Sequence, residues 1–188
     1  KIKKSDKIIK LLQALSFQIG NQVSYNELGK IVGLNSETVE SYISLLEKAF
    51  IIFRLGTFSR NLRSELKKTR KIYFVDNGIR NAIISNFNPI ELRNDVGALW
   101  ENYLMSERKK VLAYHHTYAN SYFWRTHAQQ EIDYIEEREG VIYAYEFKWG
   151  HKKAVISKTF TRAYSNAMTK IITPENVEEF LLDPNSMS

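Results

Sequence analysis

Apolar residues at intervals of three and four predict three helices in the first quarter of the chain. They recur at helical spacing through residues 5–19, 24–32 and 36–49. Ser24 and Glu27 have the Ser-x-x-Glu form of a capping box, and Gly33 supplies a tight turn before the third helix. Three helices with a short glycine-containing turn before the third are typical of a helix-turn-helix.

β-branched and aromatic residues predict two strands after these helices, at residues 51–57 and 70–75. The segment between the two strands is basic. Two strands joined by a basic loop after a helix-turn-helix are expected to form a wing. Residues 1–84 are therefore predicted to be a winged helix-turn-helix domain.

The remaining residues, 85–188, predict a second domain of mixed α/β class. Residues 85–95 contain Asn, Pro and Asp and are expected to be a linker, and a helix follows over residues 95–110. Strands are predicted at 111–118, at 121–125 continuing to 131–136, and at 141–148, with Gly140 as the turn before the last one. A helix at 157–166, a strand at 170–173 and a helix at 174–182 complete an α-β-β-β-α-β order. We expect a mixed sheet flanked by helices, separate from the strands of the first domain.

Composition narrows the kind of protein. An apolar fraction of 44% is normal for a folded chain, and the absence of cysteine excludes disulfides, zinc-thiolate sites and thiol catalysis. No run of 18 apolar residues predicts a membrane span, and the first residues lack the apolar core of a secretory signal. A cytoplasmic protein that does not engage a membrane is expected. The chain begins with Lys1 rather than Met, which indicates a piece of a longer protein.

The net charge of +6 is unevenly distributed along the chain. Residues 1–80 hold 15 Lys and Arg against 7 Asp and Glu, whereas residues 81–188 hold 12 against 14. A one-sided basic stretch is a usual feature of proteins that bind nucleic acid, although a solvated surface has the same composition. The candidate DNA-binding residues of the wing are Arg60, Arg63, Lys67, Lys68, Arg70 and Lys71. The third helix instead carries Glu37 and Glu40 outward, which favours protein docking over DNA contact.

One group of residues in the second domain could support catalysis. Glu146 and Lys148 alternate with Phe147 in a predicted strand, so the first two share one face. If the neighbouring strands form a hairpin around Gly140, Asp133 comes within reach of Glu146. Two convergent carboxylates suit Mg²⁺ or Mn²⁺, and a lysine beside the ion can orient or deprotonate a water. Glu101, on the preceding helix, would add an outer carboxylate.

Asp133 followed by Glu146-x-Lys148 resembles the signature of the PD-(D/E)xK nuclease fold, with Glu101 at the position of that fold's first-helix acid. Ile132 replaces the proline of the signature. The whole chain is also similar to the C-terminal region of bacterial predicted AAA-type ATPases, domain-of-unknown-function family 4143. The similar stretches are residues 38–43 with 46–48, 71–78, 97–102, and 122–125 before 131–133.

The resemblance implies an N-terminal ATPase domain as partner, and a P-loop motif is absent from this chain. Two functions stay open. One is an effector module of a larger AAA-type ATPase that engages nucleic acid and cleaves phosphodiesters with a metal ion, using Glu101, Asp133, Glu146 and Lys148. The other is a non-catalytic DNA-binding or protein-assembly module that keeps a nuclease-like fold.

Overall fold

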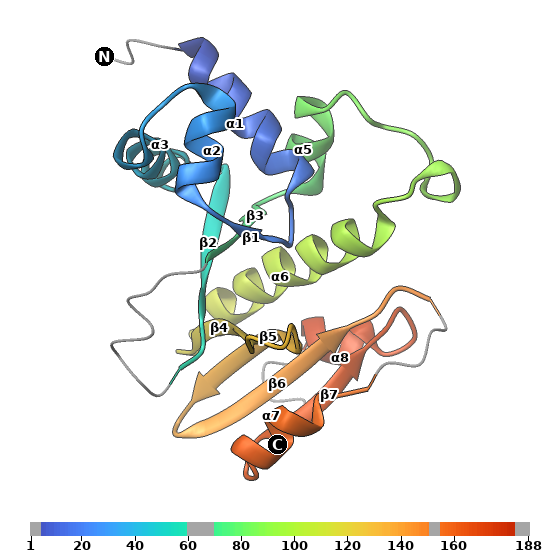
Figure 1. The fold of residues 1–188 in the computed structure, drawn as a ribbon. Coiled ribbons are helices and arrows are strands. Elements are labelled where there is room, and N and C mark those ends of the chain that lie inside the picture. The colour runs from blue at the N-terminus through green and yellow to red at the C-terminus, as the bar shows by residue number, and fades with distance from the viewer. Residues whose placement is uncertain (1–4, 60–69, 151–154, 183–188) are drawn as a thin grey trace. The chain divides into compact units, whose positions relative to one another are not determined.

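The computed structural model describes residues 5–59, 70–150 and 155–182 (Figure 1). The chain divides into two compact units. The first is drawn from Lys1–Arg54 and Thr69–Asn102, and the second from Leu55–Lys68 and Tyr103–Ser188. The domain boundary predicted between residues 84 and 85 stays a prediction.

The first unit begins with the three helices that the sequence predicts. They are α1 (Ser5–Phe17), α2 (Tyr25–Val32) and α3 (Ser36–Lys48), with the short strand β1 (Gln22–Val23) between the first two. The Ser24 hydroxyl accepts a hydrogen bond from the Glu27 amide at 3.4 Å, and Gly33 ends α2 in the left-handed conformation, with φ of 69°. The capping and turn residues therefore act where the sequence places them.

The turn between α2 and α3 also depends on Gly29, because a side chain there would collide with backbone. A Cβ atom at Gly29 would lie 2.5 Å from the Leu34 carbonyl oxygen. The helices enclose a core with strands β2 (Ile52–Thr57) and β3 (Arg70–Phe74). Its buried members are Leu11, Leu15, Ile19, Val23, Leu28, Val32, Val39, Ile43, Leu46, Ile52, Ile72 and Phe74.

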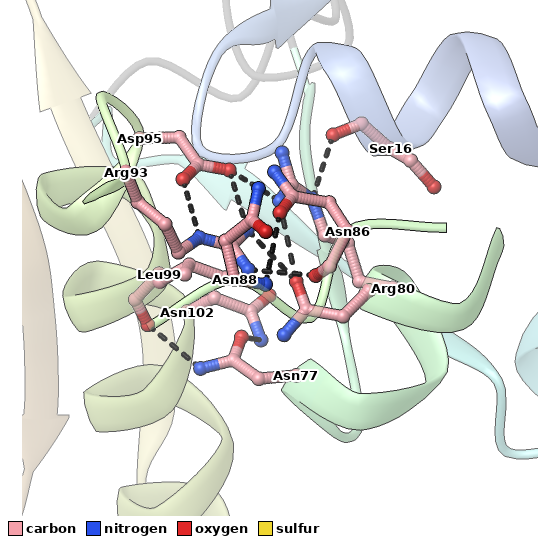
Figure 2. Close-up of polar contacts among 10 residues, drawn as sticks. Ser16, Asn77, Arg80, Asn86, Asn88, Arg93, Asp95, Leu99 and Asn102 are labelled. Atoms are coloured by element: carbon pink, nitrogen blue, oxygen red, sulfur yellow. Dashed lines mark hydrogen bonds and ion pairs between the residues drawn. The ribbon is translucent and has the colours of Figure 1, made fainter. Parts of the chain in front are cut away.

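The region predicted to be a linker is held in place by polar contacts (Figure 2). It lies between α5 (Asn77–Ile83) and α6 (Val96–Tyr114) and contains the 3-10 helix η1 (Ile90–Leu92). Arg93 donates to both oxygens of Asp95 at 2.8 Å and to the Asn86 carbonyl at 2.7 Å. Arg80, which is buried, also bonds to Asp95 and donates to the Ser16 carbonyl at 3.0 Å. These bonds to two arginines hold the pKa of Asp95 well below its ordinary value.

The strands form one seven-stranded mixed sheet in the order β1-β3-β2-β4-β5-β6-β7. Its later strands are β4 (Asn120–Arg125), β5 (Glu131–Arg138), β6 (Val141–Phe147) and β7 (Met168–Ile172). The expectation of a separate sheet in the second half is wrong. Strand β2 joins the earlier strands to the later ones. Its last residues pair in parallel with β4, Gly56 with Tyr122 and Thr57 with Phe123.

Two further details of the second half differ from expectation. Residues 111–114, predicted to begin a strand, continue α6, because Leu112 repeats the burial of Leu104 and Arg108 at intervals of four. The segments 121–125 and 131–136, predicted to be continuous, are β4 and β5, which pair antiparallel. Helices α7 (Lys158–Ala163) and α8 (Val177–Leu182) complete the fold.

The second unit packs both sides of its strands. Tyr134 and Tyr145 stack on each other and contact Phe180 of α8. A second cluster contains Trp124, Ile132, Ile135 and Ala144 and is completed by Phe58 and by Phe160 of α7. Among the residues that the structure describes, no helix is both long and apolar enough to cross a membrane.

Candidate functional site

The candidate site begins with the hairpin that joins β5 and β6. The two strands pair antiparallel from Arg138 opposite Val141 to Tyr134 opposite Tyr145. Glu139 and Gly140 form the loop, and both have positive φ, 49° and 80°. Two such residues make the type of turn that matches the twist of a hairpin. The predicted hairpin around Gly140 is confirmed.

Asp133 lies at an irregularity of β5. Trp124 pairs with Ile132 and Tyr122 with Ile135, so Asp133 and Tyr134 stand opposite the single residue Phe123 in a β-bulge. A bulge changes the direction of side chains and ends regular pairing. The Asp133 carboxylate accepts a hydrogen bond from the Phe147 amide, with 2.8 Å between Oδ2 and N. The carboxylate therefore reaches across to β6, one residue beyond Glu146.

Glu146 and Lys148 are in direct contact. The Lys148 ammonium lies 2.9 Å from Oε1 of Glu146, and the side chains are 36% and 13% exposed respectively. This contact confirms that the two residues share one side of the strand, as their alternation predicts. The Lys148 amide donates to the Ile172 carbonyl at 2.9 Å, which keeps the end of β6 alongside β7.

The arrangement offers few protein ligands for a cation. Within residues 5–59, 70–150 and 155–182, no three His, Asp or Glu side chains are grouped so that they could hold a metal ion. Asp133 and Glu146 would supply two carboxylates from adjacent strands. Mg²⁺ commonly keeps several waters and binds only one or two protein carboxylates. A cation held by these two carboxylates alone would keep most of its waters, and the assignment of Mg²⁺ or Mn²⁺ stays a prediction.

Glu101, the fourth predicted catalytic residue, is occupied within the first unit. Its Oε1 accepts from the Tyr73 hydroxyl at 2.6 Å and lies 3.1 Å from the Lys71 ammonium. Its Oε2 would lie 3.2 Å from a Cβ atom at Gly20, whose φ is +73°. Glu101 therefore fastens α6 to β3.

The predicted DNA-binding residues are only partly described. Arg60, Arg63, Lys67 and Lys68 lie outside the described residues. Arg70 is half-buried and stands opposite Val23. Lys71 is 1% exposed and pairs with Glu101, so a phosphate contact by Lys71 would require this ion pair to open.

Sequence reasoning missed the most buried charges among the described residues. Arg108 of α6 and Glu136 of β5 are both 0% exposed, and their side chains are joined by hydrogen bonds of 2.6 and 3.1 Å. Burial raises the pKa of the Tyr145 phenol, which lies beside this pair. One signal of this pair was present in the sequence. Strand alternation places Glu136 on the same side of β5 as Tyr134.

Two families match the two parts of the chain. A domain of unknown function, DUF8612, matches residues 1–90, and another, DUF4143, matches residues 96–180. The second match confirms the predicted resemblance to family 4143 over those residues.

The chain is also similar to two uncharacterized mycobacterial proteins, Rv2008c of Mycobacterium tuberculosis and Mb2031c of Mycobacterium bovis. Each is 25% identical over 131 residues, which cover 69% of this chain and 29% of the relative. The chain thus matches less than a third of the length of these relatives. No solved structure matches it.

Proposed function

We propose that the chain is an effector module of a larger AAA-type ATPase, and that it engages nucleic acid and cleaves phosphodiesters with Mg²⁺ or Mn²⁺. The observation that carries the proposal is the placement of three side chains at the end of the β5–β6 hairpin. Asp133 bonds to the amide next to Glu146, and Glu146 contacts Lys148. The winged helix and the nuclease-like fold are parts of this proposal, supported by the order of the elements.

The chemistry assigns a different task to each residue. Asp133 and Glu146 would hold the cation, which supplies Lewis-acid polarisation of the phosphate and a more acidic bound water. Lys148, held beside Glu146, would orient the attacking water and offset phosphate charge. Glu101, bonded to Lys71 and Tyr73, would support the position of α6.

The second candidate function is a non-catalytic assembly or DNA-binding module. It is favoured by the contacts of the same residues, because the Phe147 amide, Lys148 and Lys71 already interact with the three acids. The exposed acidic residues of α3, Glu37 and Glu40, also favour protein docking. The two candidates predict different results in one cleavage assay.

The assay incubates the 188-residue chain with plasmid and single-stranded DNA in Mg²⁺, Mn²⁺ or chelator. We expect metal-dependent cleavage that Glu146→Gln and Lys148→Ala abolish while circular dichroism stays unchanged. Asp133→Asn is the most informative variant. Its amide oxygen can still accept the Phe147 hydrogen bond, but the charge that a cation needs is lost.

Glu137→Gln is the matched control. Glu137 also lies on the hairpin, opposite Ile142, and belongs to no part of the candidate site. It should cleave as the parent does. Cleavage that persists in Glu146→Gln would contradict the assignment of this site. No cleavage by the parent with either metal would contradict the catalytic proposal and favour the assembly module.

A further inference from the structure

The segment around α7 carries positive charge without acids. Residues 147–173 hold six Lys and Arg and no Asp or Glu, whereas residues 103–146 hold five Lys and Arg against seven Asp and Glu. The six cations are Lys148, Lys152, Lys153, Lys158, Arg162 and Lys170. Of these, Lys152 and Lys153 lie outside the described residues. The acidic second half of the chain therefore contains one strongly basic segment.

Two cations of α7, Lys158 and Arg162, are not neutralised by neighbouring carboxylates. Both side chains are exposed, and within residues 5–59, 70–150 and 155–182 neither one forms an ion pair or a side-chain hydrogen bond. Six other cations of the second half pair with acids, namely Arg108, Lys110, Arg125, Arg138, Lys148 and Lys170. The positive charge of Lys158 and Arg162 is therefore available to an anionic ligand.

Helix α7 lies on the same side of the sheet as part of the candidate site (Figure 1). Phe160 of α7 contacts Trp124, with 5.2 Å between ring centroids, and belongs to a buried cluster that includes Ala144 of β6. Glu146 follows Ala144 by two residues in the same strand, so the two side chains point to one side. Lys148 contacts Glu146. The exposed cations of α7 and the pair of Glu146 and Lys148 thus share one side of the second unit.

Helix α7 also begins at the end of β5 where the candidate site lies. The hydroxyl of Ser157, directly before α7, donates to Oε1 of Gln130 at 3.4 Å, and Gln130 directly precedes β5. Asp133 is the third residue of that strand. Arg162 follows Lys158 by four residues, which places it about 6 Å further along the helix and on the same helix face. The two cations therefore form a short row that starts near the candidate site.

We propose that Lys158 and Arg162 bind backbone phosphates of the nucleic acid that the candidate site acts on. The inference rests on the proposed function, because it names positioning residues for that substrate. A nucleic-acid backbone carries a negative charge at every nucleotide, and exposed cations bind these charges irrespective of base sequence. Holding the strand beside Asp133 and Glu146 would orient the bond to be cleaved. Neither cation needs to touch the reacting atoms.

The composition of this surface favours phosphate over an acidic protein. Protein interfaces usually centre on large apolar or aromatic anchors and are depleted in lysine. The exposed residues of α7 include Lys158, Thr159, Thr161 and Arg162, whereas Phe160 is 0% exposed. Lysine, arginine and threonine side chains are common donors to phosphate oxygens. The outer face of α7 thus offers charge and hydroxyl groups.

The test measures binding of the full 188-residue chain to a labelled DNA duplex by fluorescence anisotropy, with chelator present so that metal-dependent cleavage cannot occur. The salt slope is the slope of the logarithm of the binding constant against the logarithm of the salt concentration. Lys158→Gln combined with Arg162→Gln should weaken binding to every duplex sequence and reduce the steepness of the salt slope by about 2, because two phosphate contacts are lost. The difference in affinity from the parent should shrink about tenfold between about 50 and 200 mM salt.

Two matched variants separate local contact from net charge and from shape. Lys109→Gln combined with Lys110→Gln removes the same net charge near the end of α6, and should keep the salt slope of the parent. Lys158→Arg combined with Arg162→Lys keeps both charges on α7 and should bind about as tightly as the parent. Circular dichroism should be the same for all three double variants and the parent, because the substituted side chains of α7 are exposed.

The outcomes distinguish this inference from the cleavage proposal. Equal salt slopes for the two glutamine variants would overturn the inference, because net charge alone would then determine binding. Competition by polyglutamate as strong as competition by unlabelled DNA, at equal charge, would overturn it in favour of an acidic protein. Binding that depends on Lys158 and Arg162, without cleavage in Mg²⁺ or Mn²⁺, would support the surface and contradict only the catalytic proposal. No binding by the parent at about 50 mM salt would contradict both.

Discussion

The buried ion pair between Arg108 and Glu136 gives the sharpest test of how the second unit is stabilised. Both side chains are 0% exposed, and the guanidinium and carboxylate meet in a two-bond, side-on geometry. Arg108 also donates to the Phe180 carbonyl at 2.5 Å and lies 4.7 Å from the Phe180 ring centroid. Glu136 therefore helps to join α6, β5 and α8 through one arginine.

Glu136→Gln keeps the shape of the side chain and removes its charge. The Arg108 guanidinium would stay buried with its counter-charge gone. Breaking a buried pair from one side costs about 3–5 kcal/mol, because the remaining charge is not compensated. Domains are stable by only about 5–15 kcal/mol, so the loss would be a large fraction of the total.

The free energy of unfolding is measured by urea denaturation followed by circular dichroism and tryptophan fluorescence. Glu107→Gln is the matched control, because Glu107 and Lys110 form an ion pair whose side chains are 33% and 40% exposed. That exposed pair should contribute less than about 1 kcal/mol. If Glu136→Gln costs no more than Glu107→Gln, the pair does not hold the unit together and the reasoning fails.

Two other predictions concern the first unit. The depressed pKa of Asp95 means that its contribution to stability is complete above its ordinary value of 3.8 and decreases as the pH falls below it. Asp95→Asn should therefore flatten the fall of the urea midpoint between about pH 5 and pH 3, relative to the parent; an equal fall in both proteins would contradict the assignment. Gly29→Ala should cost about 1–3 kcal/mol, because its Cβ meets the Leu34 carbonyl at 2.5 Å, which is backbone and cannot turn aside. Gly33→Ala should cost about 1 kcal/mol for the left-handed conformation alone. Equal losses of unfolding free energy for Gly29→Ala and Gly33→Ala, measured by urea denaturation, would refute the prediction that Gly29→Ala costs more.

Local features of the fold were predictable because the residues that determine them are adjacent in sequence. The capping box at Ser24, the left-handed Gly33 and the turn at Gly140 each specify a short stretch of backbone. The helix spacing of the first unit was equally clear. The sharing of one side by Glu146 and Lys148 followed from strand alternation and is confirmed by their contact.

Long-range pairing was not predictable from such signals. Strand β2 contains Ile52, Phe53 and Leu55 beside Arg54, Gly56 and Thr57, and nothing in this local sequence indicates that Thr57 will pair with Phe123. The end of α6 was mistaken for a strand because Val111 and the aromatic residues after it have high β propensity. Burial of Leu112 against the interior outweighs that propensity, which is weak compared with tertiary packing.

The members of the candidate site stay a prediction, and their contacts were not predictable from the sequence. Lys71 reads as a wing cation and Glu101 as an outer catalytic acid, yet the two form an ion pair with 3.1 Å between ammonium and carboxylate. Sequence separation of 30 residues hides this pairing. Each of the two residues alone fits its predicted role; only the three-dimensional arrangement shows the competition between these roles.

The hydrogen bond from Phe147 to Asp133 is compatible with both functions that stay open. A side chain that only ended the β5–β6 ladder would need one acceptor oxygen, and the amide of asparagine provides one as well as a carboxylate does. The hydrogen bond therefore accounts for an acceptor oxygen at position 133, but it does not account for the negative charge of an aspartate there. A cation shared with Glu146 would give that charge a use, and Lys148 would then face a phosphate as well as a carboxylate. Asp133→Asn separates the two roles, because it preserves the hydrogen bond from Phe147 while removing the charge that a metal ion requires.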